Sequence, residues 1–109
     1  RREVDDAPYF QLLSRPYPEA VAGRLIRYRS DLESRSFECV WEENPSITAP
    51  SLIYLPHHWF PNGYRVSLDP EGEGWSFKPM RPGSLNGHLV IPPIGRGVRR
   101  SLKVESVLK

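Results

Sequence analysis

Residues 37–56 read FECVWEENPSITAPSLIYLP, and this stretch decides the fold class. Phe37, Cys39 and Trp41 recur at every second position, so they share one face of a β-strand. A polar loop with two prolines follows. Ser51–Leu55 is then nearly continuous in apolar residues, which is typical of a central strand. The stretch therefore predicts two strands, with Phe37 and Trp41 in the core.

The same pattern extends over most of the chain. Twelve prolines and eight glycines interrupt the 109 residues and leave few windows long enough for a helix. We expect strands over Arg24–Arg29, Phe37–Trp41, Ser51–Leu55, Tyr64–Leu68, Trp75–Lys78, His88–Ile91 and Val98–Val104. Ile26 and Tyr28 should share a face of the first, and Trp75 and Phe77 a face of the fifth. About seven short antiparallel strands at this spacing predict an all-β sandwich.

The length indicates one domain. We expect a linker or short helix over residues 1–14 and the β-sandwich over residues 15–109, with residues 15–23 as an extended lead-in. The chain begins without an initiator methionine and therefore reads as a fragment.

The sequence offers no catalytic or metal-binding constellation. Glycoside hydrolysis needs two carboxyl groups flanking the bond, but Glu42 and Glu43 are neighbours at a strand end, and Glu71 and Glu73 lie in a glycine-rich turn. We interpret all four as surface charge. Cys39 is expected to be a buried thiol, and no spacing predicts a metal site or a cofactor. The chain alone is therefore predicted not to be an enzyme.

Charge gives little support for a nucleic-acid partner. The net charge is only +2, and the one dense basic cluster comprises Arg96, Arg99, Arg100 and Lys103. We interpret this cluster as a solvated edge strand protected by charge, with a phosphate or anionic-lipid patch as the alternative. No nucleic acid is expected. No apolar run approaches the length of a membrane span. The location stays open, with cytoplasm or a membrane surface favoured.

The loop His57–Phe60, between two prolines, carries a Trp-Phe pair where polar residues are usual. The pair folds back to cap the core, packs on a partner domain, or forms an exposed tip that stacks on sugar or dips into lipid. The partner and tip interpretations predict that Trp59→Ser with Phe60→Ser improves solubility and leaves the melting temperature nearly unchanged.

Two stretches resemble a known family. RPYPEAVAG at 15–23 is similar to the segment that joins the barrel to the C-terminal β-sandwich in glycoside hydrolase family 5 enzymes of the endoglycoceramidase type, a group that includes glucosylceramide- and sterylglucoside-cleaving fungal members. LPHHWFPNGYRV at 55–66 is similar to a Pro-…-Tyr-Pro-x-Gly-Tyr-x-Val stretch of that sandwich, with Phe60 where tyrosine is expected.

The resemblance covers about residues 15–105 and implies an immunoglobulin-like β-sandwich that supports a catalytic barrel. The family's catalytic glutamates lie on the barrel, so no catalytic residue is carried over. The implied partners are the barrel, and a membrane surface or glycolipid. The candidate contact residues are Arg15, Pro16, Tyr17, Pro18, His57, His58, Trp59 and Phe60.

The alternative is an autonomous carbohydrate-binding or protein-interaction module. Sugar binding would need exposed, coplanar aromatic residues on one sheet face. Trp41, Trp75 and Tyr54 are the available rings, and their alternation indicates core positions instead.

Overall fold

The structure, a computed structural model, describes residues 15–107. The predicted linker or helix over residues 1–14 lies outside them. The elements within the described part are β1 (Tyr17–Ala20), β2 (Gly23–Asp31), β3 (Ser36–Glu43), β4 (Ser51–Leu55), the 3-10 turn η1 (His57–Trp59), β5 (Tyr64–Asp69), β6 (Ser76–Pro79), β7 (Gly87–Ile91) and β8 (Arg99–Ser106). Among the described residues, no helix is long and apolar enough to cross a bilayer.

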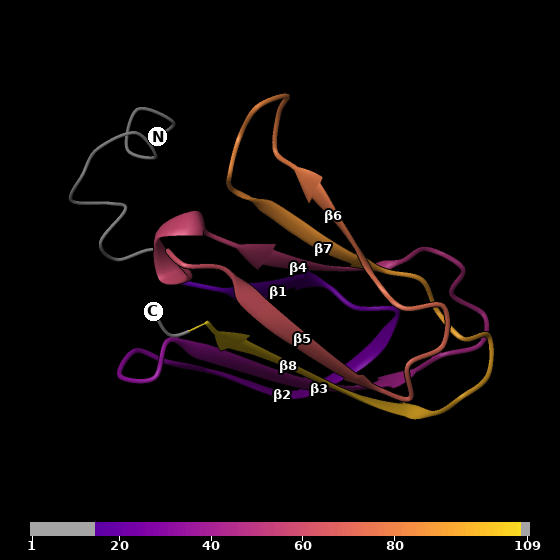
Figure 1. Cartoon of the computed structure of the whole chain (residues 1–109). Coiled ribbons are helices and arrows are strands. Elements are labelled where there is room, and N and C mark those ends of the chain that lie inside the picture. Colours follow the sequence, from indigo (N-terminus) through magenta and orange to yellow (C-terminus); the bar gives the residue numbers. More distant parts are fainter. Residues whose placement is uncertain (1–14, 108–109) are drawn as a thin grey trace.

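The strands form two four-stranded antiparallel sheets that lie face to face (Figure 1). One sheet has the order β1-β4-β7-β6 and the other β2-β3-β8-β5. This arrangement confirms the predicted all-β sandwich. Beyond the seven predicted strands, β1 lies within the extended lead-in, where Tyr17 pairs with Tyr54 of β4.

The core forms between the two sheets as the alternation predicts. Phe37, Cys39 and Trp41 are fully buried on the inner face of β3, and Ile53 of β4 is buried opposite them. Large apolar side chains on facing sheets interdigitate in this way to remove most of their surface from water. The predicted core positions of Phe37 and Trp41 are confirmed, as is the buried thiol.

Burial raises the pKa of the Cys39 thiol to about 12. Because the thiolate is the reactive form, the folded protein at pH 8 should not react with Ellman's reagent over minutes. In denaturant the same sample should release one equivalent of chromophore, since the chain has one cysteine. Rapid reaction of the folded protein would show that β3 opens readily.

A β-bulge interrupts the first predicted strand at Ile26, which was expected to share a face with Tyr28. The pairing of β2 with β3 shifts between Leu25 and Arg27, so that Leu25 lies opposite Trp41 and Tyr28 opposite Cys39. The extra residue at this β-bulge is Ile26, and one inserted residue reverses the alternation on either side of it. Leu25 and Tyr28 therefore face the core side, although both stay partly exposed.

Two of the aromatic residues interpreted as core lie elsewhere. Trp75 precedes β6, is 41% exposed and has its ring centroid 6.2 Å from that of Tyr64. Tyr54 is half-buried on the outer face of β4, because Ile53 and Leu55 take the inward positions. Phe77, which was expected to share a face with Trp75, points inward from β6 and pairs with the buried Leu89.

The basic cluster is not on an edge strand. β8 lies between β3 and β5 in the middle of its sheet. Arg99 and Lys103 are exposed, but Arg100 pairs with Trp41 of β3 and is completely buried. A charge on a central strand cannot protect an edge. The interpretation of this cluster as a charge-protected edge strand is therefore wrong.

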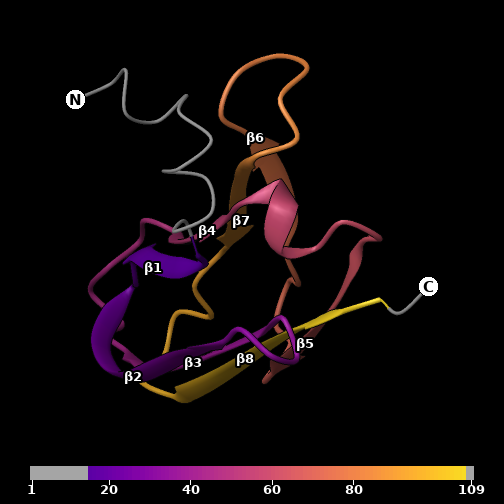
Figure 2. The same cartoon turned by 90° about the vertical axis from the view of Figure 1, so that its left-hand side faces the viewer.

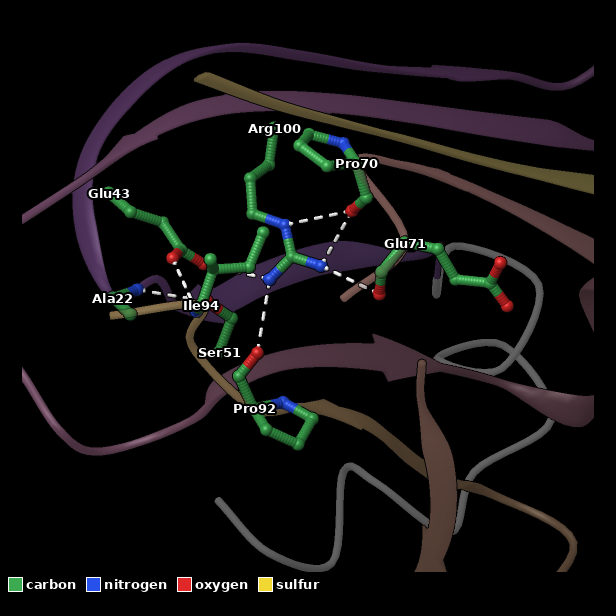
Figure 3. Close-up of polar contacts among 8 residues, drawn as sticks. All are labelled: Ala22, Glu43, Ser51, Pro70, Glu71, Pro92, Ile94 and Arg100. Carbon is green, nitrogen blue, oxygen red and sulfur yellow. Dashed lines mark hydrogen bonds and ion pairs between the residues drawn. The ribbon is translucent and has the colours of Figure 1, made fainter. Parts of the chain in front are cut away.

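Arg100 is buried because it meets a ring of acceptors (Figure 3). Its Nη1 donates to Oε2 of Glu43 at 2.9 Å and to the Pro92 carbonyl at 3.0 Å. Its Nε and Nη2 donate to the Pro70 carbonyl at 3.2 and 2.8 Å, and Nη2 also reaches the Glu71 carbonyl at 3.1 Å. One side chain thus joins the ends of β3 and β7 to the connection between β5 and β6.

Glu43 is correspondingly not surface charge. It is 4% exposed, and its Oε1 accepts the backbone N–H of Ile94 at 2.8 Å while Oε2 accepts from Arg100. A buried carboxylate requires a paired cation and further hydrogen bonds, and both are present. Glu71 and Glu73 are exposed as expected.

Candidate functional site

The two predicted contact segments, which are about forty residues apart in the sequence, meet at one end of the sandwich. The guanidinium of Arg15 lies 5.8 Å from the ring centroid of Trp59, and that of Arg35 lies 5.2 Å from it. Arg35 also donates from Nη1 to the His58 carbonyl at 3.1 Å. The lead-in, the β2–β3 turn and η1 are therefore in contact.

Within the aromatic loop, the rings point into the core. Trp59 is 1% exposed and Phe60 is 2% exposed, and both belong to the central apolar cluster. Pro56 and η1 turn the chain back so that the rings close the end of the sandwich. The backbone N–H of Trp59 donates to the Pro56 carbonyl at 3.1 Å within this turn. Of the three interpretations of this loop, capping of the core is confirmed.

The two histidines of the loop differ in exposure. His57 is exposed, and its backbone N–H donates to Oδ1 of Asn86 at 2.6 Å. His58 is half-buried. Within residues 15–107, no three His, Cys, Asp or Glu side chains come together as a metal site would require.

The lead-in is fixed firmly on the sandwich. Pro16 is fully buried, and its carbonyl accepts a hydrogen bond from the Ser30 hydroxyl at 2.9 Å. Tyr17 is 42% exposed on the outer face, and its ring contacts that of Tyr54 at a centroid distance of 5.3 Å and a tilt of 40°. Pro18 is half-buried and pairs with Ile53.

An apolar pocket of about 210 Å³ lies beside η1. Its lining residues come from the end of β4, from η1, from the start of β5 and from the β6–β7 hairpin: Leu55, Pro56, His57, Phe60, Gly63, Tyr64, Phe77 and Leu85. Burial raises the pKa of the Tyr64 hydroxyl, so this side chain is uncharged at neutral pH. The pocket is smaller than the roughly 300–1,000 Å³ of small-molecule sites, so it suits one apolar group.

Sequence reasoning did not single out Leu85 or the hairpin. The available signal was an apolar leucine and Met80 inside a loop otherwise made of turn residues. Gly87 at the base of the hairpin is required by close packing, since a Cβ there would lie 2.3 Å from the Lys78 carbonyl oxygen. Because Gly87 has no Cβ, the Phe77 side chain can lie close against β7 and line the pocket.

Comparison with known proteins places this geometry in a family. The family model of the glycoside hydrolase family 5 C-terminal domain matches residues 15–85. The chain belongs to this family. The match includes both stretches on which the resemblance rested.

An endoglycoceramidase of Hydra vulgaris is 37% identical to the domain over 59 residues, which are 52% of this chain and 11% of that protein. The structure of endo-glycoceramidase II from Rhodococcus sp. superimposes with a TM-score of 0.62 at 27% identity, over 94% of this chain and 21% of that one. Sterylglucosidase 1 of Cryptococcus neoformans shares the fold, with a TM-score of 0.64 at 18% identity over 89% of this chain and 14% of that one. The chain thus spans a small part of each relative.

Proposed function

We propose that the chain is the non-catalytic C-terminal domain of a larger glycolipid-cleaving glycosidase. In this proposal a barrel hydrolyses the O-glycosidic bond. The sandwich packs on that barrel and helps it to engage a membrane or a glycolipid. Family membership and the small share of each relative that the chain spans support this proposal.

The fixed lead-in is the observation that carries the packing role. Because Pro16 is buried and its carbonyl accepts a hydrogen bond from Ser30, the lead-in at residues 15–18 is held at a defined place on the sandwich. Arg15, Tyr17 and His57 are exposed at or next to this point and are available for contact. Trp59 and Phe60 would contribute indirectly, because their buried rings support the turn that carries the exposed contact residues.

The pairing of the carboxylates supports a non-catalytic role. Oε1 of Glu42 pairs with Arg24 at 2.7 Å, and Glu43 is enclosed with Arg100. The exposed Glu71 and Glu73 lie on a turn outside any pocket described above. Glycoside hydrolysis requires two carboxyl groups facing a shared substrate site, which these four do not form.

The sugar-binding alternative has less support. Trp41 is core, so it cannot join Trp75 and Tyr54 on a binding face. Tyr54 instead meets Tyr17 at 40° and His88 at 61° on the outer sheet face. Rings tilted in this way do not make the flat platform that stacks on a sugar.

The proposal is tested by separating the domain from the polypeptide encoded upstream. We expect the isolated domain to release no product from an aryl glucoside or from glucosylceramide, and the upstream polypeptide to carry the activity. Adding the domain should raise the melting temperature of that polypeptide by a few degrees, through binding to its native state. Glu42→Gln and Glu71→Gln serve as controls for turnover by the domain.

Turnover by the pure domain that either substitution abolishes would contradict the non-catalytic role. An upstream polypeptide with an unchanged melting temperature at high domain concentration would contradict packing.

A further inference from the structure

The loop between β6 and β7, residues 80–86, carries an unusual pair of side chains. Leu85 is 65% exposed and Met80 is 59% exposed, which makes them the two most exposed large apolar side chains among the described residues. Figures 1 and 2 show this orange loop projecting away from both sheets. Single exposed apolar residues are ordinary on a protein surface, but two on one projecting loop form a tip.

Hydrogen bonds within the loop hold this tip in shape. The Met80 N–H donates to the Asn86 carbonyl and the Ser84 N–H to the Arg81 carbonyl, each at 2.9 Å. Gly83 has a φ of +82°, which a glycine adopts without strain and which the turn requires. Asn86 also accepts from the His57 backbone. The loop is therefore braced against η1, and its apolar side chains are held in the solvent.

Apolar surface continues from the tip into the body of the domain. Leu85 lines the pocket of about 210 Å³ together with Phe77 and Tyr64. The Tyr64 ring in turn contacts the exposed Trp75. An apolar edge with a neighbouring tryptophan is the composition that proteins place at the boundary between water and lipid.

Basic side chains flank the tip. The stretch 78–88 contains Lys78 and Arg81 and no acidic residue, and both side chains are exposed. Glu19 of β1 pairs with His88 of β7 at the end of this stretch. Basic residues beside an exposed apolar tip complement the phosphates of an anionic bilayer, because the charges reach headgroups while the tip enters the acyl boundary.

We propose that the β6–β7 loop is a membrane-contact element that inserts Met80 and Leu85 into a bilayer containing anionic phospholipid. Lys78 and Arg81 contact the headgroups, and the pocket receives part of one lipid chain. This inference rests on the membrane-engagement part of the proposed function and names the surface responsible.

The experiment is sedimentation of the 109-residue chain with vesicles. Vesicles of phosphatidylcholine alone are compared with vesicles of phosphatidylcholine and phosphatidylglycerol, at low and at physiological salt. We expect binding to the mixed vesicles that weakens as salt rises. Met80→Ser with Leu85→Ser should weaken it about tenfold or more. Lys78→Gln with Arg81→Gln should weaken it about tenfold and reduce the salt dependence.

Matched controls separate this tip from other surfaces. Leu32 is 56% exposed on the β2–β3 turn, so Leu32→Ser removes a similar side chain elsewhere and should leave binding unchanged. Arg96→Gln with Arg99→Gln removes the same charge from the connection between β7 and β8 and from the first residue of β8, and it should have a smaller effect than the loop pair. Melting temperatures of all variants confirm that each is folded.

Two outcomes overturn the inference. Wild-type binding that survives in the Met80→Ser, Leu85→Ser variant, or that depends on Arg96 and Arg99 instead, shows that another surface meets the membrane and leaves the proposed engagement standing. No wild-type binding to either vesicle overturns both the loop assignment and membrane engagement, while the packing role is unaffected.

Discussion

Replacing Trp59 and Phe60 together with serine is expected to unfold the domain. Both rings are buried in the central cluster, at 1% and 2% exposure. Truncating one buried aromatic side chain typically costs about 3–5 kcal/mol, and a domain of this kind has a free energy of unfolding of about 5–15 kcal/mol. A gain in solubility with an unchanged melting temperature was expected if the rings faced a partner or solvent. Because the rings are buried, we expect a loss of stability instead.

Thermal unfolding followed by circular dichroism measures this effect. His57→Ser is the matched control, because His57 lies in the same turn with an exposed side chain and should change stability by about 0.5 kcal/mol or less. A soluble double variant that melts with the wild type would mean that the aromatic loop does not cap the core.

Arg100→Ala is expected to destabilise the domain by about 3–5 kcal/mol. The substitution leaves the Glu43 carboxylate buried without its cation and removes the donors to the carbonyls of Pro70, Glu71 and Pro92. Urea unfolding monitored by tryptophan fluorescence gives the free energy. Arg100→Lys should restore only part of it, because one ammonium group cannot reproduce the planar set of donors.

Arg99→Ala is the control for this network. Arg99 is the exposed neighbour on the same strand, and its loss should cost about 0.5 kcal/mol or less. A variant in which Arg100→Met is combined with Glu43→Leu should be more stable than either single variant, since an apolar pair avoids the unpaired charge. Equal effects of Arg99→Ala and Arg100→Ala would contradict the buried network.

Much of the fold could be predicted from local pattern. The alternation of Phe37, Cys39 and Trp41 predicts their face, because successive side chains of a strand point to opposite sides wherever the strand lies. The prolines predict where strands end for an equally local reason. The two motif stretches predicted the family, which the match over residues 15–85 confirms.

The candidate site was predictable only as a set of segments. That Arg15 meets Trp59 is a tertiary contact between the lead-in and η1. The sequence allowed three positions for the Trp-Phe pair, because an aromatic residue in a loop can cap the core, pack on a partner domain or form an exposed tip. Which one applies depends on whether the turn at Pro56 brings the rings over the end of the sheets, and the structure shows that it does.

The sequence by itself determined the strand pattern, the core face of β3 and the family, since each depends on neighbours within a few residues. Only the tertiary structure decided the bulge at Ile26, which depends on the register with β3. Only it decided that Glu43 and Arg100 are buried, because these residues neutralise each other across 57 positions of sequence. A charged residue belongs on the surface unless the fold supplies its partner, and no local pattern records that partner.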